Sequence, residues 1–167
     1  EAAHRSGVKR VVFASSNHAV GLYEVGTPLG VVEAARPDGF YGAAKAFGES
    51  LAVLYHRKWG LESASLRIGS FLQQPTEVRH LSTWLSPRDM VHLVRCCLEA
   101  PELGCAVLYG VPANTRNWWN NPEAERLGYR PQDNAERYAK IIESSALPIE
   151  NTDPAKRYMG GFIAAVD

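Results

Sequence analysis

Tyr41 and Lys45 have the residue types and the spacing of an acid–base pair. Four positions are about one helical turn, so on a helix both side chains occupy the same face. A free tyrosine phenol ionises only near pH ~10, but a neighbouring ammonium favours the phenolate, which can then accept a proton from a substrate hydroxyl. Spacing alone also allows an ordinary exposed helical pair, so the surrounding residues must decide between the two interpretations.

Polar residues follow two apolar segments that have the character of buried strands. Ser15-Ser16-Asn17-His18 ends the first segment, and Arg67-Ile68-Gly69-Ser70 ends the second. Ligands of parallel sheets bind beyond the carboxyl ends of the strands, so we expect both groups to border one site. There Ser16 would hydrogen-bond the reacting oxygen and hold it near Tyr41. For His18 the alternative is a loop histidine bonded to backbone.

The hydrophobic pattern predicts the elements that position these residues. The segment 10–16 is short, apolar and rich in β-branched residues, as in a buried parallel strand. The segments 62–68 and 105–109 are predicted as two further strands. Between the first two, the pattern predicts a helix capped by Asp38 and stopped by Gly60. Its apolar stripe, opposite Tyr41 and Lys45, comprises Phe40, Ala44, Phe47, Leu51 and Leu54. A strand, helix, strand unit of this kind takes a right-handed crossover.

Ser86-Pro87-Arg88-Asp89 predicts the start of another helix, since it combines a capping serine, a proline in the first turn and an acid three residues after the cap. The buried face expected for this helix comprises Met90, Val91, Val94, Cys97 and Leu98. Short helices are expected over 123–127 and 135–143. The fold class is therefore α/β, a Rossmann-type doubly wound parallel sheet. We expect one domain over 1–146 and a tail of unassigned structure over 147–167.

The overall composition excludes several classes of partner. Lys plus Arg and Asp plus Glu both number 18, so no net charge attracts nucleic acid or an anionic membrane. No apolar run approaches the roughly 18 residues that span a bilayer. The three cysteines form neither a disulfide framework nor a C-x-x-C metal motif, which favours the cytoplasm and predicts no metal site.

An ordered set of motifs, more specific than Tyr-x-x-x-Lys alone, resembles the extended short-chain dehydrogenases of the NAD-dependent epimerase/dehydratase type, and among them the NAD-dependent uronate dehydrogenases. The resemblance runs from about Gly7 to Glu143. The motifs that carry it are Phe13-Ala14-Ser15-Ser16-Asn17-His18, Tyr41-x-x-x-Lys45, Arg67-Ile68-Gly69-Ser70, Thr83-Trp84-Leu85-Ser86, Tyr109-Gly110, Ala113-Asn114-Thr115, Trp118-Trp119 and Leu127-Gly128-Tyr129.

This resemblance implies oxidation of a hexuronate, such as galacturonate or glucuronate, at its anomeric carbon to an aldarolactone, with reduction of NAD. The implied partner is thus a small sugar acid. The implied roles are Tyr41 as base, Lys45 as its partner and a ribose contact, Ser16, Asn17 and His18 as contacts to sugar hydroxyls, Ser70 as a substrate contact, Gly69 against the nicotinamide, and Arg79 on the carboxylate. Independently, a guanidinium fork matches a planar carboxylate, although an arginine in a long loop is often simply solvated.

One departure from the family is large, because no G-x-x-G-x-x-G turn occurs to seat the pyrophosphate. Residues 1–9 also have the character of a helix end, and we therefore expect an N-terminally truncated chain that by itself binds NAD poorly and is inactive. Two alternatives stay open: a nucleotide-sugar epimerase or dehydratase, and a non-catalytic binding or assembly module that forms homo-oligomers through an exposed sheet edge. The preferred hexuronate and the choice between NAD and NADP also stay open.

Overall fold

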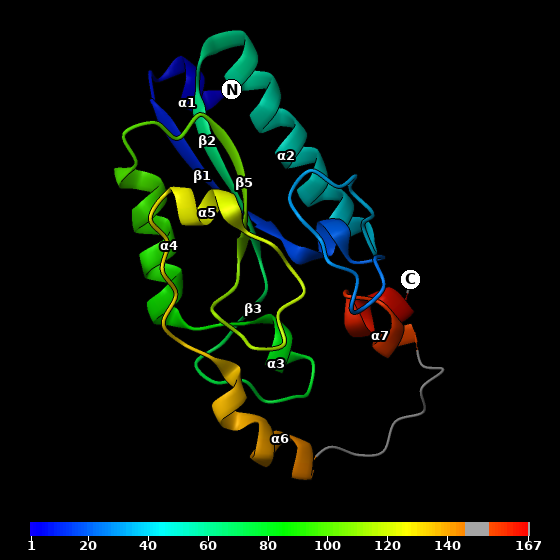
Figure 1. Ribbon diagram of the computed structural model, residues 1–167. Coiled ribbons are helices and arrows are strands. Elements are labelled where there is room, and N and C mark those ends of the chain that lie inside the picture. The colour runs from blue at the N-terminus through cyan, green and yellow to red at the C-terminus, as the bar shows by residue number, and fades with distance from the viewer. Residues whose placement is uncertain (146–153, 167) are drawn as a thin grey trace.

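A three-stranded parallel sheet lies at the centre of the computed structural model, which describes residues 1–145 and 154–166. Its strands are β1 (Arg10–Ser16), β2 (Glu62–Ile68) and β5 (Cys105–Gly110), in the order β1-β2-β5 (Figure 1). Ser16 is in register with Ile68, and Ile68 with Gly110, so all three carboxyl ends reach one edge. The α/β class with a parallel sheet and flanking helices, predicted from the sequence, is confirmed.

Helix α2 (Phe40–Trp59) connects β1 to β2 and packs on β1 with a face of small and polar residues. As expected, it stops at Gly60, which has a φ of 70°. Two expectations are wrong. Its N-cap is Gly39, without a side-chain bond, because the carboxylate of Asp38 turns to His18 instead. The predicted apolar stripe lies opposite the buried Gly42 and Glu49 and therefore faces outward, and Phe40 is 95% exposed.

Helix α4 (Pro87–Glu99) begins at Ser86, whose Oγ accepts the N–H of Asp89 as the capping pattern predicts. Its predicted buried face is wrong in part, since Val91 and Leu98 are exposed while Leu93 is fully buried. Leu93 and Cys97 are four residues apart and centre the face that meets the sheet, so residues at the edge of that face are left outside. The core cluster built on this face comprises Ala64, Leu66, Leu93, Cys97, Leu103, Ala106, Leu108, Ala124 and Tyr129.

Short elements complete the described chain. Strands β3 (Ser70–Phe71) and β4 (Trp84–Leu85) form a second, two-stranded parallel sheet. The remaining helices are α1 (Ala2–Arg5), η1 (Asn17–Val20), α3 (His80–Thr83), α5 (Pro122–Arg126), η2 (Ala135–Tyr138), α6 (Ala139–Ser145), α7 (Pro154–Arg157) and η3 (Gly161–Ala165). None of the helices in the described ranges has the length and apolar character needed to cross a membrane.

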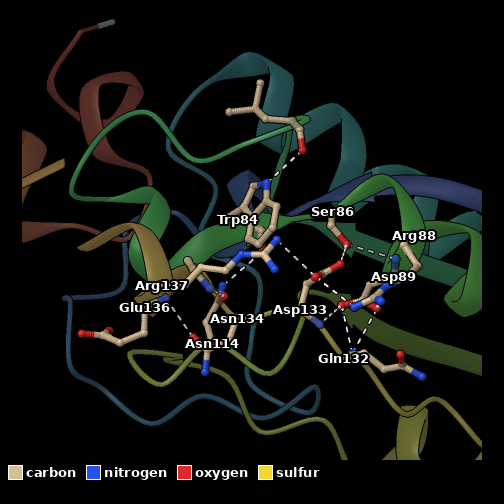
Figure 2. Close-up of polar contacts among 12 residues, drawn as sticks. Trp84, Ser86, Arg88, Asp89, Asn114, Gln132, Asp133, Asn134, Glu136 and Arg137 are labelled. Carbon is tan, nitrogen blue, oxygen red and sulfur yellow. Dashed lines mark hydrogen bonds and ion pairs between the residues drawn. The ribbon is translucent and has the colours of Figure 1, made fainter. Parts of the chain in front are cut away.

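Buried carboxylates attach the segment after α5 to the start of α4 (Figure 2). Asp89 accepts the backbone N–H groups of Gln132 and Asp133, while Ser86 Oγ donates to Asp133 Oδ2 over 2.6 Å. Beside them, Asn114 Nδ2 donates to the carbonyls of Ser82 and Trp84. These bonds fix the residues on both sides of Thr83. The polar cluster therefore supports Thr83 and its contact with Ser70 of β3.

The C-terminal residues return to the loop that follows η1, beside which α7 lies in Figure 1. Residues Glu24 and Tyr158 form an antiparallel bridge. Met159 is fully buried in a core cluster with Val20, Leu29, Tyr109, Val111 and Trp119. The segment 154–166 is thus bound to the body of the protein. The expected boundary between 146 and 147 lies outside the described residues.

Candidate active site

The end of strand β1 supplies two buried serines that point to different partners. Ser15 Oγ donates to Glu49 Oε1 of α2 over 2.6 Å. Ser16 Oγ accepts the N–H of His18 over 3.2 Å and so caps η1. This cap turns the chain sharply at the strand end, because the hydroxyl satisfies a backbone donor that the first helical turn leaves unpaired. Ser16, Asn17 and His18 are thereby held together at the carboxyl edge of the sheet.

Asn17 is 2% exposed, and its Nδ2 has no hydrogen-bond partner within the described residues. Its Oδ1 lies 3.4 Å from Ser16 Oγ. A buried amide donor without an acceptor costs roughly 1 to 3 kcal/mol, so such groups generally mark the place of a further partner. A sugar or ribose hydroxyl oxygen has the chemistry to accept this bond.

Tyr41 and Lys45 lie on one face of α2, as predicted. Lys45 Nζ is 5.2 Å from the centre of the Tyr41 ring and donates to the carbonyl of Ala14 over 2.7 Å. That bond uses one of the three ammonium donors and fixes the ammonium beside the strand end. Tyr41 is 55% exposed, so its phenol is open to a ligand. The arrangement places a cation next to an accessible phenol, which is the geometry that the acid–base hypothesis requires.

Gly42 allows the first turn of α2 to approach η1 closely. A Cβ at this position would lie 2.2 Å from the carbonyl oxygen of His18, so no larger residue fits without moving the backbone. The approach also brings the rings of His18 and Tyr41 together, edge to face, with 5.9 Å between their centroids. Glycine at this position therefore joins the Ser-Asn-His turn to the acid–base pair.

A buried ion pair supports α2 one turn beyond Lys45. Arg67 of β2 donates from Nε and Nη2 to the two carboxylate oxygens of Glu49, over 3.0 and 2.8 Å, and from Nη1 to the hydroxyl of Tyr109. Burial acts to lower the pKa of Arg67, but the hydrogen bonds and the charge of Glu49 outweigh it and raise that pKa. This two-pronged bond fixes the position of α2 over the strands, and with it the position of Tyr41.

His18 is held by a carboxylate that the sequence analysis had assigned to a helix cap. Asp38 Oδ2 lies 2.6 Å from His18 Nδ1, and the Asp38 side chain is fully buried. A carboxylate on Nδ1 keeps the hydrogen there and leaves Nε2 as the ring atom that can contact a ligand. Nε2 has no hydrogen-bond partner in the described part of the chain.

Ser70 and Arg79 form the second half of the site. Ser70 Oγ bonds to Thr83 Oγ1 over 2.8 Å and accepts a bond from Arg79 Nη1 over 3.3 Å. Arg79 Nε and Nη2 both donate to the carbonyl of Met159, over 3.1 and 2.6 Å. Burial lowers the pKa of the Arg79 guanidinium from its ordinary value. A partly desolvated cation of this kind favours an anionic ligand.

Gly69 is also needed for packing within the chain, because a Cβ there would lie 2.1 Å from the carbonyl oxygen of Thr83. The contact brings the end of β2 against α3 and β4. This packing accounts for the glycine, so its expected place against a nicotinamide stays a prediction.

Asp38 and the turn Met159–Gly161 are site components that the sequence analysis missed. A Cβ on Gly160 would lie 1.8 Å from Asp38 Oδ2, and one on Gly161 would lie 2.7 Å from Arg79 Cδ. The turn therefore sits between the two halves of the site. The only available signal was the pair of adjacent glycines in a segment without hydrophobic period.

Residues 1–88 match the NAD dependent epimerase/dehydratase family, and this stretch includes every candidate residue from Ser16 to Arg79. The chain belongs to this family. No group of three or more His, Cys, Asp or Glu side chains in the described ranges of this family member is arranged to hold a metal ion.

Several relatives of this chain are uronate or glucuronic acid dehydrogenases. The chain is 45% identical to a uronate dehydrogenase of Agrobacterium fabrum over 161 aligned residues. The alignment covers 96% of this chain and 61% of that protein. A glucuronic acid dehydrogenase structure from Chromohalobacter salexigens superposes with a TM-score of 0.97 at 43% identity, over 99% of this chain and 62% of that one. A mutant of Agrobacterium tumefaciens uronate dehydrogenase complexed with NAD superposes with a TM-score of 0.94 at 44% identity, over 98% of this chain and 62% of that one. The chain thus spans about three fifths of the length of these relatives, and the Rossmann-type fold is confirmed.

Proposed function

We propose that the protein to which this chain belongs oxidises a hexuronate, such as galacturonate or glucuronate, at C1 to an aldarolactone while NAD is reduced. The observation that carries the proposal is the exposed Tyr41 phenol with the Lys45 ammonium 5.2 Å from its ring, beside the Ser16–His18 turn. The similarity to uronate and glucuronic acid dehydrogenases supports the substrate class.

In the proposed reaction, the Lys45 ammonium stabilises Tyr41 as a phenolate, which accepts the proton of the C1 hydroxyl and becomes a neutral phenol as the C1 hydride leaves to NAD. Ser16 binds the reacting oxygen, while Asn17 Nδ2 and His18 Nε2 bind neighbouring sugar hydroxyls. Arg79 holds the carboxylate with Ser70 beside it. These contacts orient the sugar so that the proton transfer is short.

The residues present fit the nicotinamide end of NAD, which when bound supplies the hydride acceptor. The Lys45 ammonium keeps two further donors after its bond to Ala14, and the Tyr41 hydroxyl lies on the same helix face, so both can hold a ribose. Gly69 is proposed to lie near the nicotinamide. The pyrophosphate has no glycine-rich turn in this chain, so residues 1–146 are proposed as the C-terminal part of a single NAD-binding domain.

The cellular location belongs to the same proposal, while assembly belongs to the alternative one. We place the protein in the cytoplasm, supported by three free cysteines at positions 96, 97 and 105. Assembly into homo-oligomers through the edge of β1 is the alternative role, since β1 pairs with β2 along one side in the described structure. Light scattering of the purified chain separates a monomer from such an assembly.

A chimera tests the activity. In it, this chain replaces the matching residues of the Agrobacterium fabrum uronate dehydrogenase, and NADH formation is followed with galacturonate, glucuronate and galactose. We expect turnover of the acids and little turnover of galactose, which carries a hydroxymethyl group in place of the carboxylate. A folded chimera that binds NAD but oxidises neither acid would contradict the proposal. Equal use of galactose would contradict the role of Arg79.

A further inference from the structure

The Met159–Gly161 turn makes a main-chain contact with the side chain proposed to bind the substrate carboxylate. The Met159 carbonyl accepts two bonds from Arg79, one from Nε and one from Nη2. A guanidinium has five N–H donors in a fixed plane. The bond from Nη1 to Ser70 Oγ engages a third. One donor on each terminal nitrogen remains, and two such donors can bind a carboxylate in a two-pronged bond.

The turn is held firmly enough to orient the guanidinium. Met159 is fully buried, its N–H donates to the carbonyl of Tyr23 over 2.8 Å, and the N–H of Gly160 donates to the carbonyl of Gly21 over 2.9 Å. Arg157 adds a third main-chain bond, since its carbonyl accepts the N–H of Val25. These contacts attach the turn to the loop between His18 and α2, so its carbonyl has a fixed position relative to both halves of the site.

Close packing also defines the position of Arg79 from the other side. Gly161 has a φ of +65°, and a Cβ there would lie 2.7 Å from both Cδ and Nε of Arg79. The space that a side chain would fill at residue 161 is therefore occupied by the arginine itself. Glycine is needed at this position for the backbone conformation and for the arginine contact.

We propose that the Met159–Gly161 turn is a specificity-determining element that selects acidic substrates by holding Arg79. The Met159 carbonyl occupies one edge of the guanidinium, and the lack of a side chain at Gly161 lets Cδ and Nε of Arg79 lie against the turn. The terminal edge is then presented in a single orientation to the substrate carboxylate. This inference rests on the proposed function, in which Arg79 binds that carboxylate.

The variant Gly161→Ala tests the inference, and Gly104→Ala is its matched control. Both glycines have nearly the same positive φ, +65° and +63°, so alanine strains both backbones alike, but Gly104 has nothing within 4 Å of its added Cβ. In the chimera we expect Gly161→Ala to raise KM for galacturonate roughly tenfold, as expected for a weakened charge-assisted bond, with a smaller change in kcat. Residual galactose oxidation should not change, and Gly104→Ala should leave all these constants as in the unmodified chimera.

A spectroscopic measurement on the 167-residue chain tests whether the turn holds Arg79, independently of the dehydrogenase activity of the chimera. A guanidinium Nε–H that is bonded to a carbonyl exchanges slowly with water and gives a distinct NMR signal. We expect a slow Arg79 Nε–H signal in the unmodified chain and in Gly104→Ala, and its loss or marked shift in Gly161→Ala. An unchanged signal, or an unchanged KM in an active chimera, overturns the proposal. Inactivity of an unmodified chimera that folds and binds NAD contradicts the proposed function alone.

A second pair of variants covers the case in which alanine prevents folding. Asparagine adopts positive φ more readily than other residues with a side chain, so Gly161→Asn keeps the added Cβ against Arg79 with less backbone strain. Gly104→Asn is the control. The KM for galacturonate in the chimera and the Arg79 Nε–H signal of the chain are measured for both variants. If neither quantity differs between Gly161→Asn and Gly104→Asn, the proposed role of the turn is refuted.

Discussion

At the scale of single residues, the site combines groups whose chemistry depends on their immediate neighbours. The carbonyl of Ala14 holds the Lys45 ammonium beside the Tyr41 phenol, and in the proposed function this cation prepares Tyr41 as the base. His18 is likewise limited to one ligand-facing nitrogen by the carboxylate of Asp38. Tyr41 is exposed and His18 is partly exposed, whereas Lys45 is bonded to the main chain and Asp38 is buried.

Replacement of Tyr41 by phenylalanine removes only the hydroxyl. If this group is the base, kcat of the chimera should fall about 10²- to 10⁴-fold, the usual contribution of a positioned acid–base group, with a small effect on stability because the side chain is half exposed. Steady-state NADH formation and a thermal unfolding curve give both numbers. Tyr55→Phe, on the same helix but bonded to Glu1, is the control and should keep full activity. Equal kcat values for the two variants would exclude Tyr41 as the base.

At the scale of elements, the chain's pattern predicts the strands and the strand-end residues well and the helix faces less well. All three strands of the sheet were predicted, the first from its apolar, β-branched run, and the Ser86 cap predicted the start of α4. The apolar stripe of α2 was placed correctly on the helix but not in the core, because small and polar residues such as Gly42 and Glu49 form the contact with β1. Periodicity measures hydrophobicity, whereas this contact depends on close approach and an ion pair.

Removal of one partner of the buried Glu49–Arg67 pair should strongly destabilise the contact between α2 and β2. Glu49→Gln leaves a buried guanidinium without its countercharge, and breaking a buried pair in this way costs about 3 to 5 kcal/mol. The exposed pair of Arg95 and Glu99 is the matched control, since Glu99→Gln should cost at most about 1 kcal/mol. Urea unfolding of the chain measures both free energies. Similar losses for the two variants would show that the buried pair contributes no more than a surface pair.

Glu62 at the start of β2 should make the stability of the sheet depend on pH in the acidic range. Hydrogen bonds from Arg10, then from the backbone N–H of Gly104 and of Leu103, lower the pKa of Glu62 from 4.5 to about 2. Since the folded pKa lies below the unfolded one, the stabilisation is complete above about pH 4.5 and is lost as the pH falls toward about 2. The side chain is 28% exposed, which reduces the effect to on the order of 1 to 2 kcal/mol. Urea unfolding at several pH values should show this loss in the unmodified chain and a flatter profile in Glu62→Gln.

At the scale of the whole molecule, residues far apart in sequence build the site through main-chain contacts that leave little trace in the sequence. The Met159 carbonyl binds Arg79, and Gly160 lies against Asp38, yet no periodicity or capping signal marks either contact. Such contacts depend on backbone position and on the absence of side chains. Tyr41, Lys45 and Ser16 were found from residue type and position, and the other candidates up to Arg79 from the family resemblance, whereas a carbonyl oxygen is common to every residue.

Binding of NAD should distinguish this chain from the longer relatives. Within the described residues, the groups suited to the dinucleotide are gathered at the sheet edge around Tyr41 and Lys45, and the sequence has no glycine-rich turn for the pyrophosphate. Loss of even two charge-assisted hydrogen bonds costs about 3 kcal/mol, so the 167-residue chain should bind NAD at least roughly 100-fold more weakly than the chimera. Isothermal titration calorimetry of both proteins measures the difference. Comparable dissociation constants would mean that the chain's own residues hold the pyrophosphate. They would contradict the proposal that the Tyr41 site binds the nicotinamide end while a separate glycine-rich turn binds the pyrophosphate.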